Sequence, residues 1–318
     1  MSIISRLPFQ DEEAAFAYLE GTLWPEGPVC PHCGTIGTAT KLAHKGNGKR
    51  PARLGLWKCN EKECRKQFTV KVGTVFEHGR IPLHKMLQAV YLLCCSKKGI
   101  SSHQLHRILQ IQYKSAWFLS HRIREAMRDG ALAPMGGAGS TVEIDETKFG
   151  FEAGANSKTQ RHAGQFRNTV LTLVTRGGSA RSFHVEGTAV GQLLPIICVN
   201  IQRETAVMTD EASWYKWIGR EYASHDRVEH SKEEYVRYEG DRTIHTNTVE
   251  GYYSIFKRGM KGIYQHCAEK HLHRYLAEFD FRYNTRVRLG INDTERTAQA
   301  LKGMVGKRLT YRAADRAN

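Results

Sequence analysis

The sequence predicts a mixed α/β domain that follows a small cysteine-containing module and a helical segment. Three observations lead to this prediction. Two cysteine pairs lie within the first 64 residues, apolar residues recur at helical spacing between positions 82 and 129, and short β-rich runs alternate with helical ones from position 141 onward. Such an order of strands and helices is typical of a sheet with flanking helices.

We expect four regions along the 318 residues. Residues 1–80 contain the cysteine module with a helical lead, 81–130 the helical segment, 140–290 the α/β domain, and 291–318 a basic C-terminal tail. The boundary before the α/β domain is marked by a stretch rich in Gly with one Pro, residues 131–140.

The formal net charge of +15 at pH 7 indicates a polyanionic partner, because bound Lys and Arg release counterions from phosphates. Residues 41–71 carry ten Lys or Arg against two Glu, and residues 251–318 carry fourteen against six acids. Nucleic acid is therefore the expected partner, although charge runs can also serve solubility alone. No apolar run approaches the roughly 20 residues that cross a bilayer, so we expect a cytoplasmic protein without a membrane partner.

The two cysteine pairs predict a structural zinc site. In a reducing compartment cysteines point to metal ligands before disulfides. Cys30 and Cys33 form one knuckle and Cys59 and Cys64 a second, and four thiolates suit tetrahedral Zn²⁺. Without the ion, this small basic segment would have little means of folding.

Residues 82–129 are predicted to form three helices with tight turns. A break at Gly99 precedes a short helix capped by Ser101 or Ser102, and residues 110–112 form the turn before a longer helix at 114–128. This arrangement resembles a helix-turn-helix unit that binds DNA. The alternative is a helical linker that packs on its neighbours.

Two aspartates are expected at strand positions. Asp145 lies in Val142-Glu-Ile-Asp145, which alternates as a strand with one buried face does, and Asp210 directly follows the strand-like run 205–209. Ligands gather at the carboxyl ends of strands in open α/β sheets. Each aspartate is a weak signal on its own, since a residue in such a place is often a turn or cap residue.

Residues 246–257 are predicted to form a helix that brings a carboxylate and a cation to one face. Asn247, Glu250, Ser254 and Lys257 are spaced by three, four and three residues, while the apolar residues form another stripe. The alternative is a surface Glu and Lys on an amphipathic helix. Together with Asp145 and Asp210, Glu250 could hold two divalent cations about 4 Å apart for phosphoryl transfer on DNA. Mg²⁺ fits such a site, and Lys257 would meet a backbone phosphate.

These residues resemble the bacterial insertion-sequence transposases that carry an N-terminal zinc ribbon and an ISXO-like DDE domain. The resemblance runs nearly end to end. It is carried by Trp24-Pro25 before Cys30-Pro-His-Cys33, Glu143-Ile-Asp145-Glu-Thr, Thr209-Asp210-Glu211, His245-Thr-Asn-Thr-Val-Glu250-Gly and Phe281-Arg-Tyr-Asn284.

The resemblance implies an RNase H-like catalytic domain, with Asp145 on its first strand, Asp210 on its fourth and Glu250 on a later helix. Mg²⁺ or Mn²⁺ would be bound there, and Lys257 matches the family's basic residue. The third acidic position varies in this group, so Asn247 and His245 are secondary candidates. Glu250 is preferred because a carboxylate is the better ligand for a hard cation.

The implied function is that of a DNA transposase of a mobile element, associated with the bacterial nucleoid. It would bind the terminal inverted repeats and target DNA, cleave and transfer strands, and form a homo-oligomer when two ends are synapsed. Two alternatives remain: a zinc-ribbon DNA-binding regulator without catalysis, and an RNase H-like nuclease without strand transfer. Arg282, Arg286 and Arg288 are expected to face the DNA.

Overall fold

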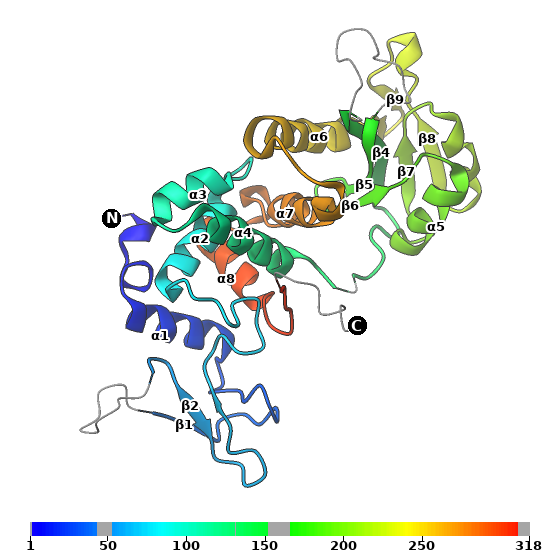
Figure 1. Ribbon diagram of the computed structural model, residues 1–318. Coiled ribbons are helices and arrows are strands. Elements are labelled where there is room, and N and C mark those ends of the chain that lie inside the picture. Colours follow the sequence, from blue (N-terminus) through cyan, green and yellow to red (C-terminus); the bar gives the residue numbers. More distant parts are fainter. Residues whose placement is uncertain (1, 43–52, 131, 152–165, 311–318) are drawn as a thin grey trace, which may run out of the picture. The chain divides into compact units, whose positions relative to one another are not determined.

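The computed structural model describes residues 2–42, 53–130, 132–151 and 166–310 (Figure 1). The chain forms two compact units, one from residues 1–129 and 291–318 and the other from residues 130–290. None of the helices in the described part of the chain is long and apolar enough to cross a membrane.

The first unit begins with two short 3₁₀ helices, Ile3–Ser5 and Leu7–Phe9, which are followed by helix α1 (Glu12–Leu23) and a small antiparallel sheet. Asp11 caps α1 by accepting a hydrogen bond from the backbone N–H of Ala14 at 2.8 Å. The sheet has the strand order β1–β2–β3, and the strands span Ala39–Lys41, Trp57–Cys59 and Gln67–Phe68. The helical lead is as the sequence predicts.

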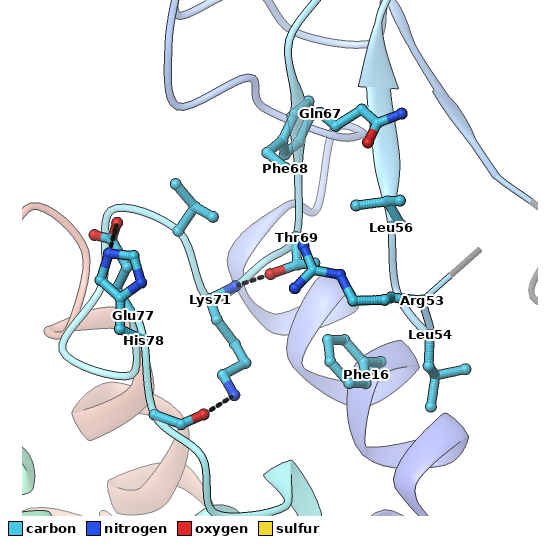
Figure 2. Close-up of a pocket in the computed structure, with 12 residues that line it drawn as sticks. Phe16, Arg53, Leu54, Leu56, Gln67, Phe68, Thr69, Lys71, Glu77 and His78 are labelled. Carbon is cyan, nitrogen blue, oxygen red and sulfur yellow. Dashed lines mark hydrogen bonds and ion pairs between the residues drawn. The ribbon is translucent and has the colours of Figure 1, made fainter.

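Helix α1 is tied to the small sheet by buried and half-buried contacts. Glu20 accepts hydrogen bonds from Lys41 Nζ at 2.7 Å and from Trp57 Nε1 at 2.9 Å. Phe16 packs against Gly55, where a Cβ would lie 2.2 Å from the phenyl ring and where φ is +68°. Figure 2 shows Phe16 beside Arg53 and Leu54, at a hollow of about 390 Å³ between α1 and the sheet.

The described part of the first unit contains four further α-helices: α2 (Leu83–Cys95), α3 (Ser102–Leu109), α4 (Tyr113–Met127) and α8 (Asp293–Lys302). Ser101 caps α3, as predicted. Gln110 then adopts a left-handed conformation with φ of +51°, which turns the chain sharply toward α4. The connection from α3 to α4 therefore has the short length that a helix-turn-helix requires.

Helix α8 differs from the expectation of a basic tail at 291–318. The chain returns to the first unit, and α8 packs against α2 with Ala300 and Leu301 buried. A capping box starts the helix, because Asn292 and Glu295 exchange side-chain and backbone hydrogen bonds. The many basic residues of this segment favoured the prediction of a tail over that of an amphipathic helix.

The second unit is built on a five-stranded mixed sheet with the order β6–β5–β4–β7–β8. The strands span Thr141–Phe151 (β4), Phe166–Thr175 (β5), Ala180–Val185 (β6), Ala206–Thr209 (β7) and Ser224–Arg227 (β8). Strands β4, β5 and β6 form an antiparallel meander, whereas β7 and β8 continue parallel to β4. A separate hairpin joins β9 (Arg237–Glu239) to β10 (Arg242–Ile244).

Helices cover both faces of this sheet (Figure 1). On one face, α5 (Val190–Asn200) and the 3₁₀ helix Ser213–Arg220 pack on Val142, Ile144 and neighbouring strands. On the other face, α6 (Asn247–Gly259) and α7 (Leu272–Asn284) pack on Val170 and Val174. The predicted mixed α/β fold, RNase H-like with a preceding zinc ribbon, is confirmed.

The expectation that β4 has one buried face is wrong. Val142 and Ile144 are buried as predicted, but Glu143 between them is also fully buried. The cause is α6, which covers the face that the alternating pattern assigned to solvent. A central strand between two helical layers has no solvent face.

Candidate zinc cluster and carboxylate site

Cys30, Cys33, Cys59 and Cys64 come together in the first unit, with all four sulfur atoms within 4.8 Å of one another. The sulfurs of Cys30 and Cys64 are 3.7 Å apart, as are those of Cys33 and Cys59. A tetrahedron with Zn–S bonds of about 2.3 Å has edges of about 3.8 Å, so the spacing fits zinc. The four-cysteine cluster thus fits the structural zinc of a zinc ribbon.

The thiols of the cluster differ in the direction in which their pKa is shifted. The hydroxyl and backbone N–H of Thr35 stabilise the Cys33 thiolate and lower its pKa to about 6. Burial, in contrast, raises the pKa of Cys59 to about 12. Four thiolates at one place therefore need a metal ion, and binding of the ion adds to the folding free energy.

Asp145 lies on β4, and Asp210 directly follows β7 at the equivalent position along this neighbouring parallel strand. Glu143 on β4 pairs with Met208 on β7, and two further residues along each chain lead to Asp145 and Asp210. Adjacent strands lie roughly 4.8 Å apart, so this register places the two aspartates side by side at the end of β7. The amide of Ala212 donates to Asp210 Oδ1 at 3.1 Å and fixes that side chain.

The surroundings of Asp145 oppose its negative charge. Burial is the main cause that raises the pKa of Asp145 to about 8, and the charges of Glu146, Asp210 and Glu250 contribute to this rise in that order of size. Burial is also the main cause that raises the pKa of Asp210, while the nearby His230 lowers it. Carboxylates from β4, β7 and α6 therefore act on one another across a common space.

Glu250 lies in the first turn of α6, and its side chain is 47% exposed. The hydroxyl of Thr246 donates to Glu250 Oε1 at 3.1 Å. His230 Nε2 lies 3.6 Å from the same oxygen. The carboxylate is thus held at the site while one side remains open to solvent.

The remaining predicted residues lie just before α6 or on it. Asn247 is exposed, and its N–H lies 3.2 Å from His245 Nδ1. His245 faces Glu143, with Nδ1 3.2 Å from Oε1, and its pKa is lowered mainly by burial. Lys257 Nζ lies 5.8 Å from the ring centre of Tyr253, whose hydroxyl is 2.6 Å from the carbonyl oxygen of Asp145.

The three carboxylates are more widely spaced than the sulfur atoms of the zinc cluster. Within the described ranges, the cysteine cluster is the one set of three or more Cys, His, Asp or Glu residues whose ligand atoms all lie within 4.8 Å. Two ions about 4 Å apart need ligand atoms that are spread more widely than those around a single ion, so the spacing of the carboxylates is compatible with a two-metal site.

Four residues near the site were not selected from the sequence: Glu143, Arg176, His230 and Tyr253. Glu143 lies in one of the motifs that carry the family resemblance, but a charged side chain is expected to be exposed to solvent. Arg176 and Tyr253 are ordinary residues of a strand end and an amphipathic helix. The turn that carries His230 is held by Ser231, whose hydroxyl donates to Glu211 at 2.6 Å. Only the tertiary structure brings these four side chains to the carboxylates.

The expectation that Arg282 faces DNA is wrong. Arg282 is 7% exposed and pairs with the buried Glu278 on the same helix. Arg286 stacks on Tyr283 at 3.9 Å and donates to the carbonyl oxygen of Gly178, whereas Arg288 is exposed. Of the other basic residues considered, Lys45, Lys49, Arg50, Arg312 and Arg316 lie outside the described residues.

Comparisons with known proteins agree with this arrangement. Residues 10–67 match the model of a transposase zinc-ribbon domain, and residues 136–284 match that of an ISXO2-like transposase domain. The chain is also 27% identical over 288 residues to a protein of Halobacterium salinarum described as an uncharacterized protein in transposable element ISH50. That alignment covers 86% of this chain and 91% of the relative.

Both domain models are matched in the order that the sequence predicts. The chain therefore carries a transposase zinc-ribbon domain followed by an ISXO2-like transposase domain, as insertion-sequence transposases do.

Proposed function

We propose that this transposase binds the terminal inverted repeats of its element and catalyses metal-dependent cleavage and transfer of DNA strands. Asp145, Asp210 and Glu250 are the proposed metal ligands, and Lys257 the proposed contact to a DNA phosphate. Asn247 and His245 are proposed as positioning residues next to them.

The observation that carries this proposal is the electrostatic conflict around Asp145. Its pKa is raised to about 8 by burial and by three neighbouring carboxylates. Like charges held together in a partly buried place are unfavourable unless a cation binds between them. A site with this composition supports divalent cation binding better than any purely structural role.

Mg²⁺, or Mn²⁺ in its place, fits the oxygen donors of these three side chains. When bound, the ions would activate a water or a 3′-hydroxyl and stabilise the leaving oxygen. The chain itself orients the ligands: Ala212 fixes Asp210 and Thr246 fixes Glu250. The partly exposed Glu250 leaves room for a DNA strand to approach.

The first unit supplies the proposed DNA-binding elements. The zinc ribbon carries exposed Lys58 and Lys62, and α3 and α4 carry exposed Arg107 and Lys114. Such cations contact phosphates, and the beginning of α4 has the position of a recognition helix after its turn. We propose that these elements bind the element ends, and that a homo-oligomer brings two ends together.

The test uses purified full-length protein, labelled element ends and Mg²⁺, with nicking and joining scored separately. Asp145→Ala should abolish both reactions, because the site loses a ligand, and should leave binding of the ends intact. The exposed Asp241→Ala is the matched control and should cleave and join as the original protein does.

Other results of this cleavage and joining assay would indicate a different site or a different function. Cleavage and joining retained in Asp145→Ala would overturn the proposed site. Hydrolysis without joining by the original protein would indicate a nuclease. Binding that is independent of Mg²⁺, with no cleavage, would indicate a regulator.

A further inference from the structure

We propose that Glu143 is a positioning residue, whose buried carboxylate caps helix α6 and thereby fixes Glu250 relative to Asp145. This inference rests on the proposed role of Glu250 as a metal ligand.

Glu143 is fully buried, yet both of its carboxylate oxygens are hydrogen-bonded. Oε1 accepts from Arg176 Nε at 2.7 Å and from the hydroxyl of Thr248 at 2.8 Å. Oε2 accepts from the backbone N–H groups of Thr248 at 2.8 Å and Val249 at 3.0 Å. A buried carboxylate whose two oxygens both accept hydrogen bonds is tolerated in the protein interior, and these charged hydrogen bonds hold its partners in place.

The contacts of Glu143 are those of a helix cap. The first N–H groups of a helix have no partner within it, and the residue before the helix usually supplies one. That residue is Thr246, which makes no capping hydrogen bond. Glu143 takes its place from strand β4, and a carboxylate is favourable beside the helix N-terminus. The hydroxyl of Thr246 is then able to donate to Glu250.

Arg176 extends the connection to the segment that leads into α6. Its Nη1 donates to the carbonyl oxygen of Thr243 at 2.5 Å and its Nη2 to that of His245 at 2.8 Å. The backbone N–H of Arg176 donates to the carbonyl oxygen of Thr141 on β4 at 3.0 Å. The pair Glu143 and Arg176 therefore clamps the start of α6 to the strand that carries Asp145.

This clamp acts directly on the geometry of the proposed site. Asp145 follows Glu143 by two residues on the same face of β4, and Glu250 directly follows Val249, which is bound by Glu143. Loss of the clamp would let α6 shift against the sheet. Residues that orient metal ligands typically contribute about 10- to 100-fold in metal affinity or activity.

The experiment is an Mg²⁺ titration of end cleavage by full-length Glu143→Gln, with Asp145→Ala in parallel. We expect the Mg²⁺ concentration for half-maximal cleavage to rise about tenfold or more. Binding of the labelled ends without Mg²⁺ should be unchanged. Glu278→Gln is the matched control: Glu278 is also fully buried and paired with an arginine, but it lies on α7, where it pairs with Arg282 and accepts a hydrogen bond from Tyr264.

An unchanged Mg²⁺ requirement in Glu143→Gln, with Asp145→Ala inactive, would overturn the inference and leave the proposed function standing. An equal rise in Glu278→Gln would overturn it too, since the effect would then be general destabilisation. Activity retained in Asp145→Ala would instead refute the proposed function.

If Glu143→Gln does not fold, Thr248→Val offers a second test, because it removes one hydrogen-bond donor to Glu143. The Mg²⁺ concentration for half-maximal cleavage should then rise by a smaller factor, and no rise would count against the clamp.

Discussion

At the scale of single residues, Asp145 is held in a place that disfavours its charge. Its pKa in the folded protein is about 8, compared with an ordinary value of 3.8. The folded state therefore binds this proton more tightly than the unfolded state does. Stability of the metal-free protein must then fall as the pH rises from about 4 to 8, and the effect is largest near and above pH 8.

Asp145→Asn should consequently stabilise the metal-free protein. At pH 8 we expect a melting temperature several degrees higher, with the difference shrinking toward pH 4. Mg²⁺ should raise the melting temperature of the original protein but not that of the variant. Thermal unfolding across this pH range measures both effects.

The exposed Asp241→Asn serves as the control and should change little. An Asp145→Asn variant that melts at the same temperature as the original protein at pH 8 would contradict the electrostatic account.

Single residues differ in how far the sequence predicts them. Asp145 and Asp210 are predictable because strand periodicity and strand ends are local patterns. Glu143 is not, since its partners on α6 lie 105 residues later and its burial depends on a helix docking over β4. The burial of Arg282 could not be predicted for a related reason. Only the packed structure shows that Glu278 neutralises its charge in the protein interior.

At the scale of elements, local signals locate most helices and strands well. Asp11 and Ser101 start helices where capping chemistry predicts them, and β4 begins at Thr141 as expected. The pairing order of the five strands is not encoded locally, because β7 joins β4 in parallel across an intervening helix. The resemblance to a known family implied the RNase H-like fold and the strands that carry Asp145 and Asp210, whereas the pairing order comes from the structure.

The zinc ribbon is an element whose fold depends on its ion. Cys59→Ser should reduce bound zinc from about one ion per chain to none and unfold the small sheet, because three thiolates leave the tetrahedron incomplete. Atomic absorption measures the zinc. Tryptophan fluorescence reports the sheet, since Trp57 packs edge-on against Trp24.

Cys267→Ser is the matched control, because Cys267 lies in the second unit and outside the cluster. This variant should keep its zinc. Full zinc occupancy in Cys59→Ser would show that the cluster is not the zinc site.

At the scale of the whole molecule, the first unit is discontinuous in sequence. Helix α8 lies after the second unit but packs in the first, where Ala300, Leu301 and Met304 are buried. Arg296 Nη1 also donates to the carbonyl oxygen of Cys94 at the end of α2, at 3.1 Å. Residues of α8 and the turn after it are therefore part of the core of this unit.

A chain that ends at residue 290 should have a destabilised first unit. Removal of α8 uncovers the apolar face of α2, so we expect faster proteolysis of the first unit and weaker binding of element ends. Limited proteolysis and an electrophoretic binding assay measure these changes. A chain that ends at residue 310 keeps α8 and should match the full-length protein, whereas equal protease resistance at 290 would argue against a structural role for α8.

The return of α8 to the first unit has a consequence for synthesis on the ribosome. The second unit is complete once residue 290 has emerged, so it can fold first. The first unit, although it starts earlier in the chain, must wait for α8. A nascent chain, or one terminated before α8, would then carry the RNase H-like unit without a finished first unit, and translation through α8 would precede the DNA binding that we propose for the first unit.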